Sequence, residues 1–151
     1  MKINVPLLFL VVFLIITYSV ALQKGLTPEN ILIAFLVGTG LSQFMGGMGH
    51  IFSPTRVAKS IGWPASPRFQ YEVGIANIVV GLLCISTIYF RDNWILASIV
   101  ASAIWGWGNA IGHILSWYYD DNTKGGNIGL MLYLDIFIPL ISIILYIIYK
   151  R

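Results

Sequence analysis

Charged residues are scarce in this chain, and so are cysteine and histidine. Lysine, arginine, aspartate and glutamate together make up 10% of its 151 residues, whereas hydrophobic residues make up 58%. A soluble domain has about 25% charged residues, so this chain has too few to cover a surface that faces water. With a mean hydropathy of +0.82, the composition predicts an integral membrane protein.

The other scarcities exclude particular kinds of chemistry. Cys84 is the single cysteine, so an intrachain disulfide and a cysteine metal cluster are both excluded. The sequence has no basic face with interleaved aromatic residues, which argues against nucleic acid as a partner. The motifs of serine hydrolases, zinc proteases and nucleotide-binding loops are also missing. Whether the protein is an enzyme therefore stays open.

What the chain does have is a series of long apolar runs that predict an all-α protein with one transmembrane domain over residues 1–151. Each run is long enough to cross a bilayer as a helix. The predicted membrane-spanning helices cover residues 5–21, 28–52, 69–90, 94–118 and 127–149, and an amphipathic helix over 54–61 is predicted to lie at the membrane interface. The first run also fits a secretory signal, because Ser19-Val20-Ala21 resembles a cleavage site. We favour a retained helix.

The two histidines, His50 and His113, lie in similar surroundings. The segment 38–53 aligns with 101–116 at an offset of 63 residues, with small residues opposite small residues. At the same offset Glu72 aligns with Asp135, so each histidine is followed by an acid 22 residues later. Such self-similarity predicts an internal repeat.

The predicted fold is therefore a four-helix bundle made of two hairpins that run in the same sense, plus an N-terminal helix. Parallel repeats of this kind are known among membrane proteins. In this arrangement both histidines and both acids, which we expect to be buried, fall in one layer near one end of the bundle. We expect neutral polar side chains to line the same layer: Gln43, Tyr71 and Asn109.

Several chemical roles fit a layer of His50, His113, Glu72 and Asp135. The groups are candidate ligands for a divalent metal or for haem b, in which a carboxylate holds the second nitrogen of a ligand histidine. They also fit a proton-coupled carrier or channel, because imidazole titrates near neutrality. A structural role, in which the groups only lock four helices together, is a third interpretation. Ionisable residues inside a membrane are functional candidates by default.

Basic residues gather around the predicted interfacial helix. Arg56, Lys59 and Arg68 are candidates for contact with anionic lipid headgroups. The simpler interpretation is that they form a solvated loop that sets the topology. A lipid bilayer is the partner that the sequence predicts, and both a homo-oligomer and a larger membrane complex are compatible with the small size.

Parts of the chain resemble known families. The segments 49–52, 57–67 and 72–77 resemble the signature of an uncharacterised family of small bacterial and archaeal membrane proteins, a domain of unknown function. This resemblance implies a prokaryotic cell membrane and carries no activity. The span 61–82, with its turn Gly62-Trp63-Pro64 before a helix that contains Glu72, is similar to DoxX-like membrane proteins. That similarity implies a link to quinone and sulfur redox chemistry, so a small metal-binding, haem-binding or redox-associated membrane protein is the leading hypothesis. A proton-coupled carrier and a non-catalytic subunit of a membrane complex are the alternatives.

Overall fold

The computed structural model describes residues 11, 14–15, 17–19, 22–23 and 25–151. Within these residues the secondary-structure elements are helices, and those with defined bounds are α2 (Pro28–Phe52), α3 (Pro54–Ile61), α4 (Pro67–Ser86), α5 (Asn93–Asp120), α6 (Gly125–Ile128) and α7 (Leu130–Tyr149). The predicted first helix over 5–21 lies mostly outside the described residues, so a fifth membrane-spanning helix stays a prediction.

Helices α2 and α3 have the bounds that were predicted from the sequence. Thr27 begins α2, where its side-chain oxygen accepts a hydrogen bond from the Asn30 backbone N–H at 3.2 Å, and Pro28 occupies the first helical position. Both features favour a helix start, because the cap satisfies a free donor and proline has none to satisfy. Ser53 separates the two helices, and Gly62 ends α3 in the left-handed conformation with φ of 91°.

The other predicted helices need correction at their ends. Helix α4 ends at Ser86 and not at residue 90, because Ser86 and Thr87 turn their hydroxyls back onto the carbonyls of Leu83 and Cys84. Such local bonds compete with helix continuation. The predicted helix over 127–149 is divided into α6 and α7 by Gly129, whose backbone is extended. A side chain at Gly129 would collide with the Gly125 carbonyl.

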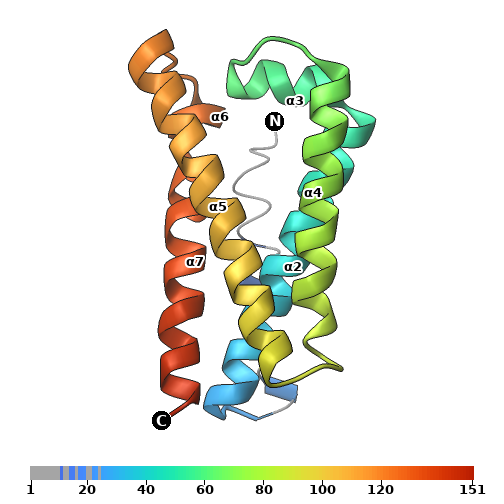
Figure 1. The fold of residues 1–151 in the computed structure, drawn as a ribbon, viewed down its shortest axis with the longest axis vertical. Coiled ribbons are helices and arrows are strands. Elements are labelled where there is room, and N and C mark those ends of the chain that lie inside the picture. Colours follow the sequence, from blue (N-terminus) through green and yellow to red (C-terminus); the bar gives the residue numbers. More distant parts are fainter. Residues whose placement is uncertain (1–10, 12–13, 16, 20–21, 24) are drawn as a thin grey trace.

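Figure 1 shows how the helices are arranged. Helices α2 and α5 run in one direction, and α4 and α7 return antiparallel to them. The short helices α3 and α6 lie at the end where α2 and α5 finish, and they contact each other there. We call this the histidine end, because it includes His50 near the end of α2 and His113 in the last two turns of α5.

The main apolar core lies in the opposite half of the bundle. It combines the first turns of α2 and α5 with the last turns of α4, and its buried members are Leu32, Ile33, Leu36, Val37, Val80, Cys84, Ile95 and Ile99. The last turns of α7 pack against this core. The histidine end is therefore held by other means, which are hydrogen bonds and close backbone contacts.

Helices α2 and α4 approach through facing glycines. A Cβ atom added to Gly40 would lie 2.6 Å from the Gly81 carbonyl oxygen, and one added to Gly47 would lie 2.6 Å from the Gly74 carbonyl oxygen. Gly40 and Gly47 are two helical turns apart, as are Gly74 and Gly81, so the antiparallel helices touch at two matched levels. Small residues permit this kind of close helix contact in membrane proteins.

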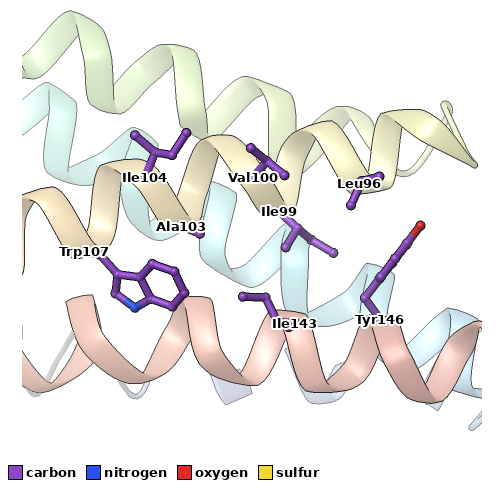
Figure 2. Close-up of a pocket in the computed structure, with 8 residues that line it drawn as sticks. All are labelled: Leu96, Ile99, Val100, Ala103, Ile104, Trp107, Ile143 and Tyr146. Atoms are coloured by element: carbon purple, nitrogen blue, oxygen red, sulfur yellow. The ribbon is translucent and has the colours of Figure 1, made fainter.

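Helices α5 and α7 meet at a similar small-residue contact. A Cβ atom at Gly106 would lie 3.0 Å from both the Asp135 carbonyl oxygen and Pro139 Cγ. Next to this contact an apolar pocket of about 270 Å³ opens between the two helices, lined by Leu96, Ile99, Val100, Ala103, Ile104, Trp107, Ile143 and Tyr146 (Figure 2). No histidine or acid lines it.

Four segments of the described chain are long and apolar enough to cross a membrane: Pro28–Phe52, Pro67–Ser86, Asn93–Asp120 and Gly125–Tyr149. Many large apolar side chains on these helices are exposed, for example Ile104 at 71%. Large exposed apolar surfaces are rare on soluble monomers. Together these observations suggest a membrane protein.

The facing glycines lead to a first prediction. Gly47→Ala should destabilise the protein by about 1–3 kcal/mol, because the backbone carbonyl opposite cannot move away without separating the helices. Gly46→Ala is the matched control, since nothing lies within 4 Å of a Cβ atom there, and alanine favours a helix over glycine by about 1 kcal/mol. Thermal unfolding in detergent, followed by circular dichroism, measures both. Equal melting temperatures for the two variants would contradict the proposed contact.

Candidate functional site

His113 is at the centre of the polar cluster at the histidine end. It is buried in α5, and its ring nitrogen Nδ1 lies 2.8 Å from Oδ1 of Asn127 in α6. The amide nitrogen of Asn127 donates to the carbonyls of His113, at 3.0 Å, and of Asn122, at 2.9 Å. Gly125 and Gly126 precede this asparagine, and a Cβ atom at Gly126 would collide with the Ser60 carbonyl. Gly126 thus lets α6 approach α3, which brings Asn127 against the histidine of α5.

This geometry fixes the tautomer of His113. Both amide hydrogens of Asn127 are used on carbonyls, so its Oδ1 can only accept, and Nδ1 of His113 must carry the proton. In the neutral ring Nε2 then holds a lone pair. Nε2 faces Oδ2 of Asp135 at 3.8 Å, and the two side chains are 8% and 12% exposed.

A lone pair that faces a carboxylate would be repelled unless a proton lies on one of the two groups. The geometry therefore allows one exchangeable proton to be shared between α5 and α7, on the imidazole ring or on the carboxyl group. The 3.8 Å separation is too long for a direct hydrogen bond, so full contact requires a small movement of one helix against the other.

Trp63 covers the other side of His113. The two rings are stacked with centroids 5.3 Å apart and an interplanar angle of 29°. Trp63 follows Gly62, whose left-handed backbone turns the chain back toward α5. Asn122 secures this loop by donating to the Ile61 carbonyl at 3.0 Å and to Ser116 Oγ at 3.1 Å. Hydrogen bonds and ring stacking therefore hold His113 in place.

His50 has a simpler environment. Its Nδ1 lies 2.6 Å from Oε1 of Gln70, a residue in the first turn of α4 that is only 1% exposed. An amide oxygen accepts, so the ring donates from Nδ1 here too. Among the described residues, Nε2 of His50 has no hydrogen-bond partner. The structure thus pairs each histidine with a side-chain amide from the segment that returns along the hairpin.

The expectation that both acids are buried is wrong for Glu72. The structure shows Glu72 exposed, whereas Gln70, Gly74 and Asn77 form the buried face of α4. Each residue advances a helix by about 100°, so Glu72 points roughly 200° away from Gln70. In α7 the buried face includes Pro139 and Ser142, and Asp135 shares it. Glu72 and Asp135 thus have the same spacing from their histidines in the sequence, but they lie on different faces of their helices, one exposed and one largely buried.

The remaining predicted site residues are scattered. Gln43 and Asn109 are half-buried, and Tyr71 is 54% exposed. Arg56, Lys59 and Arg68 are all exposed near the histidine end. Among the residues that the structure describes, no group of three or more histidine, cysteine, aspartate or glutamate side chains could hold a metal ion.

Sequence reasoning missed the amides that hold the histidines. Gln70 and Asn127 do not align at the repeat offset, since Gln70 aligns with Tyr133. A usable signal existed in the glycine pair before Asn127, which indicates a close backbone approach. The stacking of Trp63 on His113 was also missed, because it depends on the turn at Gly62.

With this geometry described, the chain can be compared with known proteins. One family model matches residues 3–151, and it describes a family of unknown function, DUF6790. The chain belongs to this family. Comparisons with curated proteins and with solved structures gave no match. Membership of DUF6790 confirms that the chain belongs to a family of unknown function, and the similarity to DoxX-like proteins stays a prediction.

The two amides give a prediction that nitrogen NMR can check, because the chain has only two histidines. In protein labelled with ¹⁵N-histidine, both rings should show a protonated Nδ1. Asn127→Leu should change the Nδ1 signal of His113 and leave that of His50 in place, because only the first loses its acceptor. Gln70→Leu should do the reverse. A spectrum of His113 that is unchanged in the Asn127 variant would contradict the tautomer assignment.

Proposed function

We propose that this DUF6790 protein handles protons in a lipid bilayer, as a small proton-coupled carrier or channel, with His113 and Asp135 as the exchanging pair. One observation carries the proposal. Nε2 of His113 and Oδ2 of Asp135 are 3.8 Å apart. The other ring nitrogen, Nδ1, donates its proton to Asn127 in a hydrogen bond. The pair therefore gains and loses its shared proton at Nε2 and the carboxyl group.

The energetics of the bilayer support this role. An aspartate at the centre of a membrane helix costs about 2.5–3.5 kcal/mol on insertion scales. Asp135 lies within Gly125–Tyr149, the most apolar of the four candidate spans, with a mean hydropathy of 2.4. A lysine or arginine would neutralise the acid permanently, whereas histidine neutralises it reversibly. A residue pair that only locked helices would not need reversible charge.

The larger architecture belongs to the same proposal. We infer two hairpins of common origin, α2 with α4 and α5 with α7, and an N-terminal spanning helix, in the cell membrane of a prokaryote. The common direction of α2 and α5 (Figure 1) supports the duplication, as does the amide on Nδ1 of each histidine. The exposed residues Arg56, Lys59 and Arg68 would contact lipid headgroups. A homo-oligomer or a larger complex would use the exposed apolar helix faces.

Haem or metal binding is a second candidate, and the ring orientation favours it. A ligand histidine has its second N–H held by an acceptor, and both rings have Nδ1 held in that way. Purified protein should then show a Soret band or a stoichiometric metal, and His50→Ala should remove it. A spectrum without a Soret band, together with metal analysis far below one atom per chain, would eliminate this candidate and leave the proton proposal intact.

Proton flux tests the leading proposal. Liposomes that contain the protein and an internal pH dye should acidify under an inward proton gradient with a potassium ionophore present. Asp135→Asn should slow acidification about tenfold or more, because asparagine cannot exchange a proton. Glu72→Gln is the matched control, since that carboxyl group is exposed, and it should keep the wild-type rate. Wild-type liposomes no faster than protein-free ones, or a fully active Asp135→Asn variant, would refute the proposal.

A further inference from the structure

A second pocket opens at the histidine end, outside the His113–Asp135 pair. It has a volume of about 430 Å³, and its lining includes Trp63, Gly112, Leu115, Ser116, Tyr119 and Asp120. The side chains come from the last two turns of α5 and from the loop after α3. Unlike the pocket in Figure 2, whose exposed lining is wholly apolar, this one has polar surface. It is open to the surroundings of the protein, so a ligand can enter directly.

The lining combines two aromatic rings with one carboxylate and has no basic residue. Trp63 and Tyr119 provide the aromatic rings, and Asp120 provides the carboxylate. An organic ammonium cation is attracted to the negative face of an aromatic ring, most strongly for tryptophan. Leu115 and Pro64 offer apolar surface for the methyl or methylene groups of such a ligand. The chemistry of the lining thus selects a cation with an apolar shell.

The end of α5 adds to the negative potential. The carbonyls at the C-terminus of a helix carry a partial negative charge that favours cations and disfavours acids. Yet α5 ends with Asp120 and is capped by Asp121, and its last turn contains no basic residue. The Lys124 ammonium is directed to the Lys59 carbonyl at 3.4 Å, over α3. A bound cation would compensate the charge at this helix end.

The tryptophan is held in position before any ligand arrives. Its ring stacks on His113, and the position of a Cβ atom at Gly112 lies 3.8 Å from Trp63 Cη2. A preformed ring lowers the entropy lost on binding. From this combination we propose that the pocket binds an organic ammonium cation. The proposal does not require proton exchange, because the residues that would hold the cation lie outside the His113–Asp135 pair, although Trp63 contacts His113.

Direct titration tests the binding. Choline and tetramethylammonium should quench or shift tryptophan fluorescence of the full-length protein in a maltoside detergent, with saturation that sodium chloride at equal concentration does not reproduce. Asp120→Asn and Tyr119→Leu should each weaken binding about tenfold. Both residues are exposed, so the variants should fold normally, and calorimetric titration gives a second readout.

The chain supplies a matched control at the neighbouring position. Asp121 is an acid that does not line the pocket. Asp121→Asn should therefore bind choline as the wild type does. Absence of saturable binding, or equal losses for Asp120→Asn and Asp121→Asn, would overturn the proposal.

Lipid composition identifies the source of the ammonium group. Choline affinity should be compared in nanodiscs of phosphatidylcholine and of phosphatidylglycerol. A weaker affinity in phosphatidylcholine, lost in the Asp120→Asn variant, would show that the lipid headgroup occupies the pocket. Equal affinity in both would show that the pocket takes a soluble ammonium compound. The flux assay is separate, so failure of one proposal is distinguishable from failure of the other.

Discussion

The side-chain amide of Asn127 is the interaction on which the histidine end depends. Its three hydrogen bonds join the α5 backbone, the loop after α5 and the ring of His113. A buried polar group that loses its partner costs about 1–3 kcal/mol, and here one side chain satisfies three such groups. The same bonds fix the proton on Nδ1, and thereby decide what Nε2 can do toward Asp135. Asn127 therefore supports both the fold of the histidine end and the proposed chemistry.

The two halves of the bundle are stabilised by different forces. The half away from the histidines has an apolar core in which Leu36 and Ile95 are fully buried. The histidine end instead uses a glycine approach between α3 and α6, and a network of asparagine side chains. Hydrogen bonds are directional, whereas burial of apolar surface is not. A directional network is the better means of holding a ring nitrogen opposite a carboxyl group.

Much of the fold could be predicted from the sequence, because its signals are local. Proline after a hydroxyl residue marked the start of α2, and Gly62 marked the end of α3. The site was less predictable. Repeat spacing placed Glu72 beside Asp135 in the alignment, but only helical phase decides which side chain is buried. Gln70 and Asn127 reach their histidines through the turns before α4 and α6, and turn geometry of that kind has no simple sequence pattern.

Pro139 gives α7 an uneven stiffness. Proline has no N–H to donate to the carbonyl four residues earlier, which in α7 belongs to Asp135. A helix that lacks one backbone hydrogen bond bends most easily at that point, since no bond must break. The most easily bent part of α7 therefore starts at Asp135, which faces His113. Gly106 of α5 packs directly against this part. Small tilts of one part of α7 against the other would change the distance between His113 and Asp135 while the rest of the bundle keeps its shape.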